Sequence, residues 1–429
     1  MGQALHSTET GRETALLVGV LPPGGPAWAV QDSLDELAQL AATAGATVVD
    51  RVVFRHHAPH PATFIGRGQA EQIAAQVGER GVATVVFDDD LTPVQGRNLE
   101  QVLGTKVLDR TQLILDIFAR HAHSREGRLQ VELAQAEYLL PRLRRQATQF
   151  GQQKGGIGLR GPGERQIEID RRQLQKRMVQ IRRALETVGR RRGELRHSRR
   201  RQGWSLFTLI GYTNAGKSTL LNRLTGAHVA ADDQLFATLD PTTRRLRLPN
   251  RQAALITDTV GFIRKLPHHL VDAFRATLEE VVQADVLIHV IDAAHARAAE
   301  QIEAVGQVLA SLGVRDKPVV DVLNKCDQPE AAAQSRRLAG RLPRAVSVSA
   351  LTGAGLDDLR HTLADCLAAA VRPLRLRVPL TEGSFLAALR QAARIHTEQY
   401  EAHQVRLEVS VPAAWVSRCM PYVIPEDTP

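Results

Sequence analysis

A glycine-rich run in the middle of the chain has the residue types and spacing that hold phosphate. It reads Gly211-Tyr-Thr-Asn-Ala-Gly-Lys-Ser218 and fits the pattern G-x-x-x-x-G-K-S. Its glycines let successive backbone N–H groups point into one concavity, Lys217 can reach the β- and γ-phosphates, and the Ser218 hydroxyl can bind Mg²⁺. An apolar run at 206–210 and a helical pattern after the loop place it between a strand and a helix N-terminus. The run therefore predicts phosphate and Mg²⁺ binding.

A second motif, Asp258-Thr-Val-Gly261, follows another apolar run and supplies groups for the far end of a triphosphate. Asp258 can hold the Mg²⁺ shell through water, and the Gly261 N–H can face the γ-phosphate. Both roles are those of a nucleotide-controlled switch.

A polar segment before that motif offers a hydroxyl ligand for the metal ion. Thr238 lies in this segment, 232–243, and can bind Mg²⁺ when a triphosphate orders it. Thr242 and Thr243 are alternatives for the same role.

Two later motifs at strand ends can recognise guanine. Asp327 can accept hydrogen bonds from the N1–H and the exocyclic amine of guanine, which adenine cannot offer. Asn324 can brace the neighbouring loop, and Lys325 can lay its stem across the base. In Ser349-Ala-Leu351, the Ala350 N–H can donate to guanine O6. All these motifs follow in order at strand ends, where α/β folds bind ligands, so we expect an enzyme that hydrolyses GTP.

The predicted site combines these motifs. The predicted Mg²⁺ ligands are Ser218 and Thr238, with Asp258 acting through water. The residues expected to bind GTP are Gly211, Tyr212, Thr213, Asn214, Ala215, Gly216, Lys217, Ser218, Thr219, Phe236, Thr238, Asp258, Gly261, Asn324, Lys325, Asp327, Ser349, Ala350 and Leu351.

Positive charge is concentrated in one segment of the 429-residue chain. Residues 142–201 contain 19 Lys and Arg against 5 Asp and Glu, a net charge of +14, whereas the whole chain carries +9. This excess favours contact with a nucleic acid over a merely solvated helix face, which is the alternative. Aromatic side chains are nearly absent there, so we expect contacts with phosphates and shape rather than with bases. The candidate contact residues are Lys154, Arg160, Arg165, Arg171 and Arg172.

The alternation of apolar runs with helical patterns predicts two α/β regions, 14–122 and 203–372, each with a mainly parallel sheet. Between them, 123–202 predicts two antiparallel helices packed on apolar seams, with the glycine-rich stretch 151–163 at the tip. Pro141 either kinks the first of these helices or marks a wrong boundary. The expected strands cover 15–20, 47–54, 83–87, 106–108, 206–210, 244–248, 253–257, 286–291, 319–323 and 345–348.

The ends of the chain are simpler. Residues 1–13 predict a disordered lead, and 373–429 predict a small α+β appendage of βαβ type with a helix at 385–396. No apolar run approaches the roughly 18 residues that span a membrane, and no signal-peptide pattern is present, so we expect a soluble, cytoplasmic protein. Three separated cysteines include no C-x-x-C pair, which argues against a disulfide framework or a cysteine zinc site.

Clustered histidines raise a competing metal hypothesis. They lie in or near predicted loops without other matching ligands, so solvated or packed side chains are the favoured interpretation. The histidines concerned are His56, His57, His60, His121, His123, His268 and His269.

The motifs resemble those of the translation-factor-related GTPases, and within them the Obg-like group. The stretches 155–172, 233–242 and 64–68 are similar to the HflX family of ribosome-binding GTPases, and the likeness covers about residues 14 to 372. This resemblance implies an N-terminal α/β domain, a helical linker and a GTPase domain. It also implies binding to the 50S ribosomal subunit and its rRNA, with the linker hairpin reaching toward the peptidyl-transferase region, and splitting or rescue of stalled 70S ribosomes.

Two residues bear on mechanism once the resemblance is considered. Phe262 stands where Ras-like proteins place the glutamine that orients the attacking water. We therefore expect slow basal hydrolysis, with the missing positioning of water supplied by the ribosome or by a rearranged switch segment. Asn214 resembles the asparagine that binds K⁺ in potassium-stimulated relatives, where K⁺ acts in place of an arginine finger; a simple turn asparagine is the alternative.

Two other functions remain open from the sequence. The chain can be an rRNA-binding scaffold or ribosome-assembly factor in which GTP only licenses binding. A third hypothesis gives the N-terminal domain nucleotide chemistry of its own, on ATP, although residues 14–120 contain no phosphate-loop pattern. We expect a monomer without membrane insertion.

Overall fold

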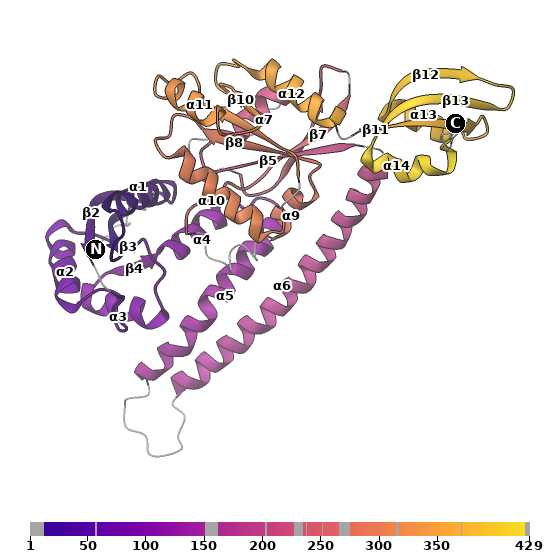
Figure 1. Ribbon diagram of the computed structural model, residues 1–429. Helices are drawn as coiled ribbons and strands as arrows, with labels where there is room; N and C mark the ends of the chain where they lie inside the picture. Colours follow the sequence, from indigo (N-terminus) through magenta and orange to yellow (C-terminus); the bar gives the residue numbers. More distant parts are fainter. Residues whose placement is uncertain are drawn as a thin grey trace, which may run out of the picture. The chain divides into compact units, whose positions relative to one another are not determined.

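Figure 1 shows the computed structural model. It describes residues 13–424 apart from 56–57, 151–161, 202–203, 227–234, 237, 251, 266–274, 315–316 and 370. The chain falls into two compact units. Unit 1 comprises Met1–Leu185, Gln234–Phe236 and Arg264–Phe274, and unit 2 comprises Glu186–Asp233, Ala237–Ile263 and Arg275–Pro429.

Unit 1 contains a four-stranded, fully parallel sheet in the order β2-β1-β3-β4, as the sequence pattern predicts. Helices follow the strands in turn, which is the connection that parallel strands require. The elements are β1 (Thr14–Leu21), α1 (Ala27–Thr43), β2 (Thr47–Arg55), α2 (Arg67–Arg80), β3 (Thr84–Phe87), α3 (Pro93–Leu103), β4 (Lys106–Asp109) and α4 (Arg110–His121).

Local sequence explains where two of these helices begin. Thr92 caps α3 by accepting a hydrogen bond from the Gln95 N–H, and Pro93 occupies the first helical position, where its missing N–H costs nothing. Asp109 caps α4 by accepting from the Gln112 N–H at 2.8 Å. Asp109 is also the last residue of β4, so α4 begins directly at the end of that strand.

The basic hairpin consists of α5 (Arg125–Phe150) and α6 (Pro162–Arg201). Its seam is the predicted one: Leu133 and Ala136 of α5 pack with Met178 and Ile181 of α6. Ion pairs flank this seam, Arg177 with Glu132 at 2.6 Å and Arg182 with Glu137 at 2.8 Å. Figure 1 shows the two helices running antiparallel.

Pro141 does not end the first helix of the hairpin, because α5 continues through it to Phe150. The neighbouring Arg142 fastens α5 to the strand ends of the sheet. Its guanidinium stacks 3.3 Å from the Tyr138 ring centroid and donates to the Leu91 carbonyl at 2.9 Å and to Asp109 at 3.0 Å. Arg142, counted in the basic segment, therefore has a structural role.

Unit 2 contains a six-stranded sheet in the order β10-β9-β8-β5-β7-β6. All neighbours are parallel except β6 and β7, which form an antiparallel pair with Thr242 opposite Asp258. The elements are β5 (Ser205–Gly211), α7 (Lys217–Thr225), β6 (Thr242–Arg247), β7 (Ala253–Asp258), α9 (Arg275–Gln283), β8 (Val286–Asp292), α10 (Ala298–Ser311), β9 (Val319–Asn324), α11 (Ala331–Ala339), β10 (Ala345–Ser347) and α12 (Leu356–Ala369).

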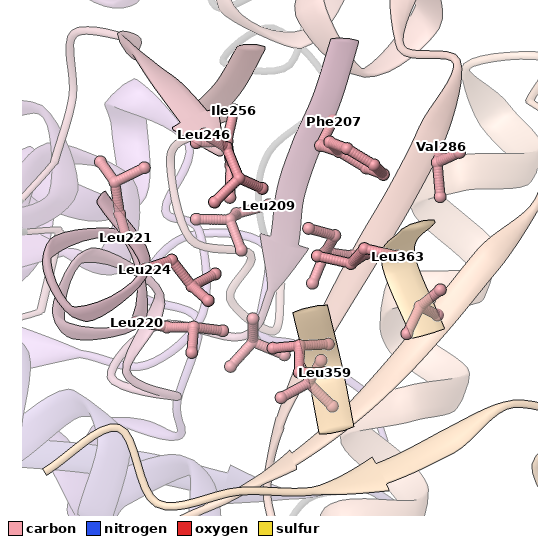
Figure 2. Packing of buried hydrophobic residues seen from close by; sticks show 14 of the residues in the cluster. Phe207, Leu209, Leu220, Leu221, Leu224, Leu246, Ile256, Val286, Leu359 and Leu363 are labelled. Atoms are coloured by element: carbon pink, nitrogen blue, oxygen red, sulfur yellow. The ribbon is translucent and has the colours of Figure 1, made fainter. Parts of the chain in front are cut away.

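The core of this sheet fixes the strand and helix that carry the phosphate loop. Figure 2 shows side chains from β5, α7 and α12 meeting in one apolar cluster. Phe207 and Leu209 of β5 are fully buried in it, as are Leu220 and Leu221 of α7. Each such side chain contributes about 1.5–3 kcal/mol when removed from water.

The C-terminal part of unit 2 is a three-stranded antiparallel sheet in the order β11-β13-β12, with its own core around Trp415. The expected βαβ unit was wrong in two respects: β11 and β13 pair antiparallel, and residues 394–396 belong to a third strand and not to the end of a helix. The elements are β11 (Val371–Pro379), α13 (Gly383–Ala392), β12 (Arg394–Tyr400), β13 (Gln404–Pro412), α14 (Ala413–Cys419) and η1 (Met420–Tyr422).

Candidate nucleotide site

The phosphate loop leaves β5 at Gly211 and enters α7 at Lys217, as predicted. Its two glycines are required by shape. Gly211 has φ +146°, and a Cβ there would lie 2.2 Å from the Val290 carbonyl oxygen. Gly216 has φ +92°, and a Cβ there would lie 2.3 Å from Asn324 Nδ2. A residue with a Cβ at 211 would collide with β8, and one at 216 would collide with the side chain of Asn324 at the end of β9.

Lys217 is buried beneath the loop. Its Nζ donates to the carbonyl oxygens of Gly211 at 3.2 Å and Tyr212 at 2.7 Å. Burial lowers the pKa of Lys217 to about 8, although the charge of Asp258 works in the opposite direction. Burial likewise raises the pKa of Asp258, against the effects of Lys217 and of two hydroxyl donors. The loop thus holds a lysine that gains or loses its charge near pH 8.

Three of the predicted metal-binding side chains lie together. Ser218 Oγ donates to Asp258 Oδ2 at 2.6 Å, Thr238 Oγ1 does so at 3.0 Å, and the two hydroxyl oxygens are 2.8 Å apart. The rival hydroxyl of Thr243 instead pairs with Thr257 across the β6–β7 ladder, at 2.8 Å. Thr238 is therefore the threonine that the structure brings to the other two ligands.

These residues fit Mg²⁺. Asp258 Oδ1 is buried and has no hydrogen-bond partner within the described residues, so one carboxylate oxygen is left for a cation or its water. Mg²⁺ prefers oxygen ligands and is commonly held by one carboxylate, water and the substrate phosphates. Ser218 and Thr238 would supply the protein's hydroxyl ligands.

The segment after Asp258 lies directly on the phosphate loop. The Phe262 N–H donates to the Gly211 carbonyl at 3.0 Å, and the Phe262 carbonyl accepts from the Thr213 N–H at 2.8 Å. A Cβ on Gly261 would lie 2.8 Å from Thr213 Cα and 2.9 Å from Lys217 Nζ. Only glycine fits this approach.

The Phe262 side chain is buried, at 3% exposure. It therefore offers neither a hydrogen bond nor an exposed edge to a water molecule at the phosphate loop. Sequence reasoning identified the substitution but not the backbone pairing that accompanies it.

Asn324 joins the two loops on either side of the predicted base site. Its Nδ2 donates to the Ala215 carbonyl at 2.8 Å, and its Oδ1 accepts from the Ala350 N–H at 2.9 Å. Without nucleotide the Ala350 N–H is thus bonded to Asn324, and its donation to guanine O6 stays a prediction. The next N–H, that of Leu351, makes no hydrogen bond within the described part of the chain.

The carbonyl groups of that second loop are held by an arginine that the motifs did not reveal. Arg223 of α7 donates from Nε to the Ala350 carbonyl at 3.2 Å and from its terminal nitrogen to the Leu351 carbonyl. Asp327 is exposed, so its carboxylate is accessible to a base. A helix that begins at the phosphate loop thus also positions the base loop.

One residue predicted to bind GTP is assigned to unit 1. Phe236 belongs to unit 1, where its ring packs 4.6 Å from that of Phe118. It is buried, and its role there is packing. Its contact with GTP stays a prediction.

The structure places only part of the predicted RNA-contact set. Arg172 is exposed and pairs with Glu168 at 2.7 Å, whereas Arg171 is half-buried. Lys154 and Arg160 lie outside the described residues. Arg165 lies in α6, but its side chain is outside the described part of the structure.

The histidines form no metal site in the described residues. No group of three or more His, Cys, Asp or Glu side chains there could hold a metal ion. His60 contacts Thr63 and His121 contacts the Ile117 carbonyl. His56, His57, His268 and His269 lie outside the described residues. The three cysteines are free, and none of the described helices combines the length and apolar character needed to cross a bilayer.

Family models match three successive parts of the chain. Residues 31–119 match a GTP-binding GTPase N-terminal model, 121–199 a GTP-binding GTPase middle region, and 207–325 a 50S ribosome-binding GTPase model. The GTPase HflX of Escherichia coli is 46% identical over 391 residues, which is 90% of this chain and 92% of that relative. The chain belongs to the HflX family. It is accordingly a GTPase, as its motifs predict.

Other HflX proteins show the same extent of similarity. GTPase HflX of Lacrimispora saccharolytica is 44% identical, covering 89% of this chain and 90% of the relative. That of Caldanaerobacter subterraneus is 38% identical, covering 99% and 97%. A solved GTP-binding protein from Sulfolobus solfataricus in complex with GDP is also similar, with 26% identity, a TM-score of 0.43, and coverage of 82% of this chain and 98% of that one.

Proposed function

We propose that this HflX-family GTPase binds the 50S ribosomal subunit in the cytoplasm, as a monomer, and splits or rescues stalled 70S ribosomes under the control of GTP. The observation that carries the proposal is the basic antiparallel hairpin of α5 and α6 in a chain whose residues 207–325 match a model described as a 50S ribosome-binding GTPase. A long, positively charged helix pair suits an RNA surface, because rRNA presents a dense array of phosphates.

The described part of α6 contains cations that remain available for such contacts. Arg177 and Arg182 are engaged with glutamates of α5. By contrast, Lys176, Arg190 and Arg191 are exposed and form no ion pair within the described residues. These three side chains are the strongest candidates for contact with rRNA phosphates.

The nucleotide site supports control by GTP. Thr238 and Gly261 approach the Ser218–Asp258 pair and the phosphate loop from separate segments. A γ-phosphate with Mg²⁺ would bind both segments, and hydrolysis would release them. We therefore propose that the Mg·GTP form engages the ribosome and that hydrolysis releases the protein.

Hydrolysis itself depends on groups that position water and neutralise charge. Because the buried Phe262 cannot orient water, we propose a slow basal rate that the ribosome increases. Asn214 is exposed in the phosphate loop with φ +60°. This position suits either a K⁺ ligand or a turn residue. Turnover measured in K⁺ and in Na⁺ separates the two, because equal rates exclude a K⁺ role.

Cosedimentation with 50S and 70S particles tests the proposal. The protein is compared in GTP, in GDP and in a slowly hydrolysed GTP analogue, with Lys176, Arg190 and Arg191 replaced by Ala. We expect the wild type to bind and split in GTP, to stay bound in the analogue, and to lose affinity in the triple variant. A matched control replaces Arg336, Arg337 and Arg341, which are exposed on or just after α11.

Two outcomes contradict the proposal. Equal affinity for the ribosome in GTP and in GDP would show that the nucleotide does not control binding. Binding without splitting, with no release on hydrolysis, would support a scaffold or assembly factor in its place.

A further inference from the structure

An aspartate outside all the GTPase motifs contacts the lysine of the guanine-recognition motif. Lys325 Nζ lies 2.7 Å from Asp292 Oδ2, and the two side chains are only 25% and 17% exposed. A lysine in water would move freely about its four-carbon stem. Here its ammonium group has a defined partner.

Asp292 is itself held rigidly. It is the last residue of β8 and stands opposite Asn324, the last residue of β9, in the parallel ladder. The ladder continues one step further, because the Ala293 N–H donates to the Asn324 carbonyl at 3.0 Å. The second carboxylate oxygen, Oδ1, accepts from the Ala294 N–H at 3.0 Å. Both oxygens of Asp292 are therefore used, and the carboxylate has little freedom to follow a moving lysine.

The backbone of Lys325 is equally unusual. Its φ is +63°, in the left-handed region that residues other than glycine rarely adopt. The following turn is closed by a hydrogen bond from the Gln328 N–H to the Lys325 carbonyl at 3.0 Å. Such strained residues persist where the surroundings fix them, and they are frequent in ligand sites.

We infer that Asp292 is a positioning residue for the guanine site, acting through Lys325. With its ammonium held by Asp292, the lysine presents its methylene stem as a fixed apolar surface for one face of the purine. Asp327 reads the hydrogen-bonding edge of the base and Asn324 joins the loops around it. Asp292 touches neither the base nor the phosphates, and its contribution is to hold Lys325 before the ligand arrives.

This role has a specific signature in binding. A surface beneath the ring contacts any purine, so it increases the affinity for guanine and hypoxanthine nucleotides alike. It does not change the ratio between them, which the edge contacts with Asp327 decide. A ligand without a base gains nothing. The role depends on guanine-nucleotide binding alone and is independent of the ribosomal partner.

Asp292→Asn tests the inference, because the amide keeps the shape and the oxygen that accepts from Ala294 but loses the charge. Dissociation constants for GDP, IDP and inorganic pyrophosphate are measured on the full-length protein by calorimetry or competition. We expect GDP and IDP to bind about threefold to tenfold more weakly, with their ratio unchanged and pyrophosphate unaffected. Asp357→Asn, on the exposed surface of α12, is the matched control and should change none of the three.

A double-mutant cycle with Lys325→Met completes the test. Methionine keeps an apolar stem without the ammonium, so Asp292→Asn should then change GDP binding less than twofold. Three results would overturn the inference. They are unchanged GDP affinity in Asp292→Asn, an equal loss for GDP and pyrophosphate, which indicates general damage to the site, and an undiminished effect in the Lys325→Met background.

Discussion

The lysine of the phosphate loop combines two demands that conflict in the free protein. Lys217 must be charged to bind phosphate, yet burial disfavours its charged form. A bound polyphosphate removes the conflict because its negative charge stabilises the ammonium group. The cost of burying Lys217 is therefore recovered only when nucleotide is present.

A pH dependence follows from the pKa of Lys217, which lies at about 8 in the free protein. Below pH 8 the lysine is already charged, so this proton does not affect GDP affinity. Above pH 8 binding must take up a proton, and the dissociation constant should increase by up to about tenfold per pH unit. Calorimetry from pH 7 to 9.5, in buffers with different ionisation enthalpies, measures both quantities. A constant affinity without proton uptake would contradict the prediction.

The free protein should show the opposite trend in stability. The unfolded chain keeps an ordinary lysine pKa, which is higher than the folded value, so it binds more protons between the two. Stability then increases with pH across the window from about 8 to 10.4. Thermal melting without nucleotide, over the same pH range, checks the sign.

Phe262→Ala separates packing from catalysis. The side chain is buried, so its truncation should cost about 3–5 kcal/mol of stability. Because Phe262 contributes no hydrogen bond to the attacking water, the basal single-turnover rate should stay within about threefold of wild type. Ile263→Ala, also buried, controls for the loss of packing. Loss of ribosome-stimulated turnover in the first variant alone would indicate a direct catalytic role.

At the scale of elements, the hairpin is attached to the sheet of unit 1 through a buried charge. Asp109 accepts from Tyr138 at 2.9 Å and from Arg142 at 3.0 Å while it also caps α4. Burial raises the pKa of Asp109, and Arg142 opposes this change. One carboxylate thus connects β4, α4 and α5.

Arg142→Ala should destabilise unit 1 by about 3–5 kcal/mol at neutral pH, because it leaves the buried Asp109 charge without its cation. It also raises the folded pKa of Asp109 further, and a raised aspartate pKa removes stability as the pH increases. The loss should therefore be smaller at pH 5 than at pH 8. Denaturant unfolding at the two pH values measures it, with Arg190→Ala on exposed α6 as the control. Equal losses at both pH values would exclude Asp109 as the cause.

Sequence patterns identified most elements because their signals are local. The strand, glycine loop and helix around Gly211 are encoded within a few residues, and so is the seam of the hairpin. By contrast, β12 was predicted to be partly helical, since 385–396 has a helical pattern. Its antiparallel pairing with β13, the next strand along the chain, decides its conformation against the helical pattern.

The candidate site was predictable to the same degree. The motifs named Ser218 and Asp258, but the preference for Thr238 over Thr243 needed the folded positions of their hydroxyl groups. Asp292 and Arg223 have no motif, since their partners come from other strands and loops. The hydrogen bond from the Ala350 N–H could not be predicted either, because its acceptor is the Asn324 side chain, 26 residues away.

At the scale of the whole molecule, the uneven charge predicts how ribosome binding responds to salt. Each cation that contacts a phosphate releases counterions, so the slope of log affinity against log salt should change by about 0.7–0.9 per contact. Replacement of Lys176, Arg190 and Arg191 by Ala should reduce the slope by about 2–3 units. Cosedimentation across a salt series measures this, and the variant of Arg336, Arg337 and Arg341 should retain the wild-type slope.

The pairing of Phe262 with the phosphate loop has a consequence for how such a chain can diverge. Both of its hydrogen bonds use main-chain atoms, donated by Phe262 to Gly211 and by Thr213 to Phe262. Every residue except proline carries the same N–H and C=O groups. The two hydrogen bonds can therefore form with any residue except proline at 262. The close approach to the phosphate loop, by contrast, requires a residue without a Cβ at 261. A substitution at 262 therefore changes the buried packing and leaves these main-chain bonds available, whereas the close approach requires glycine at 261.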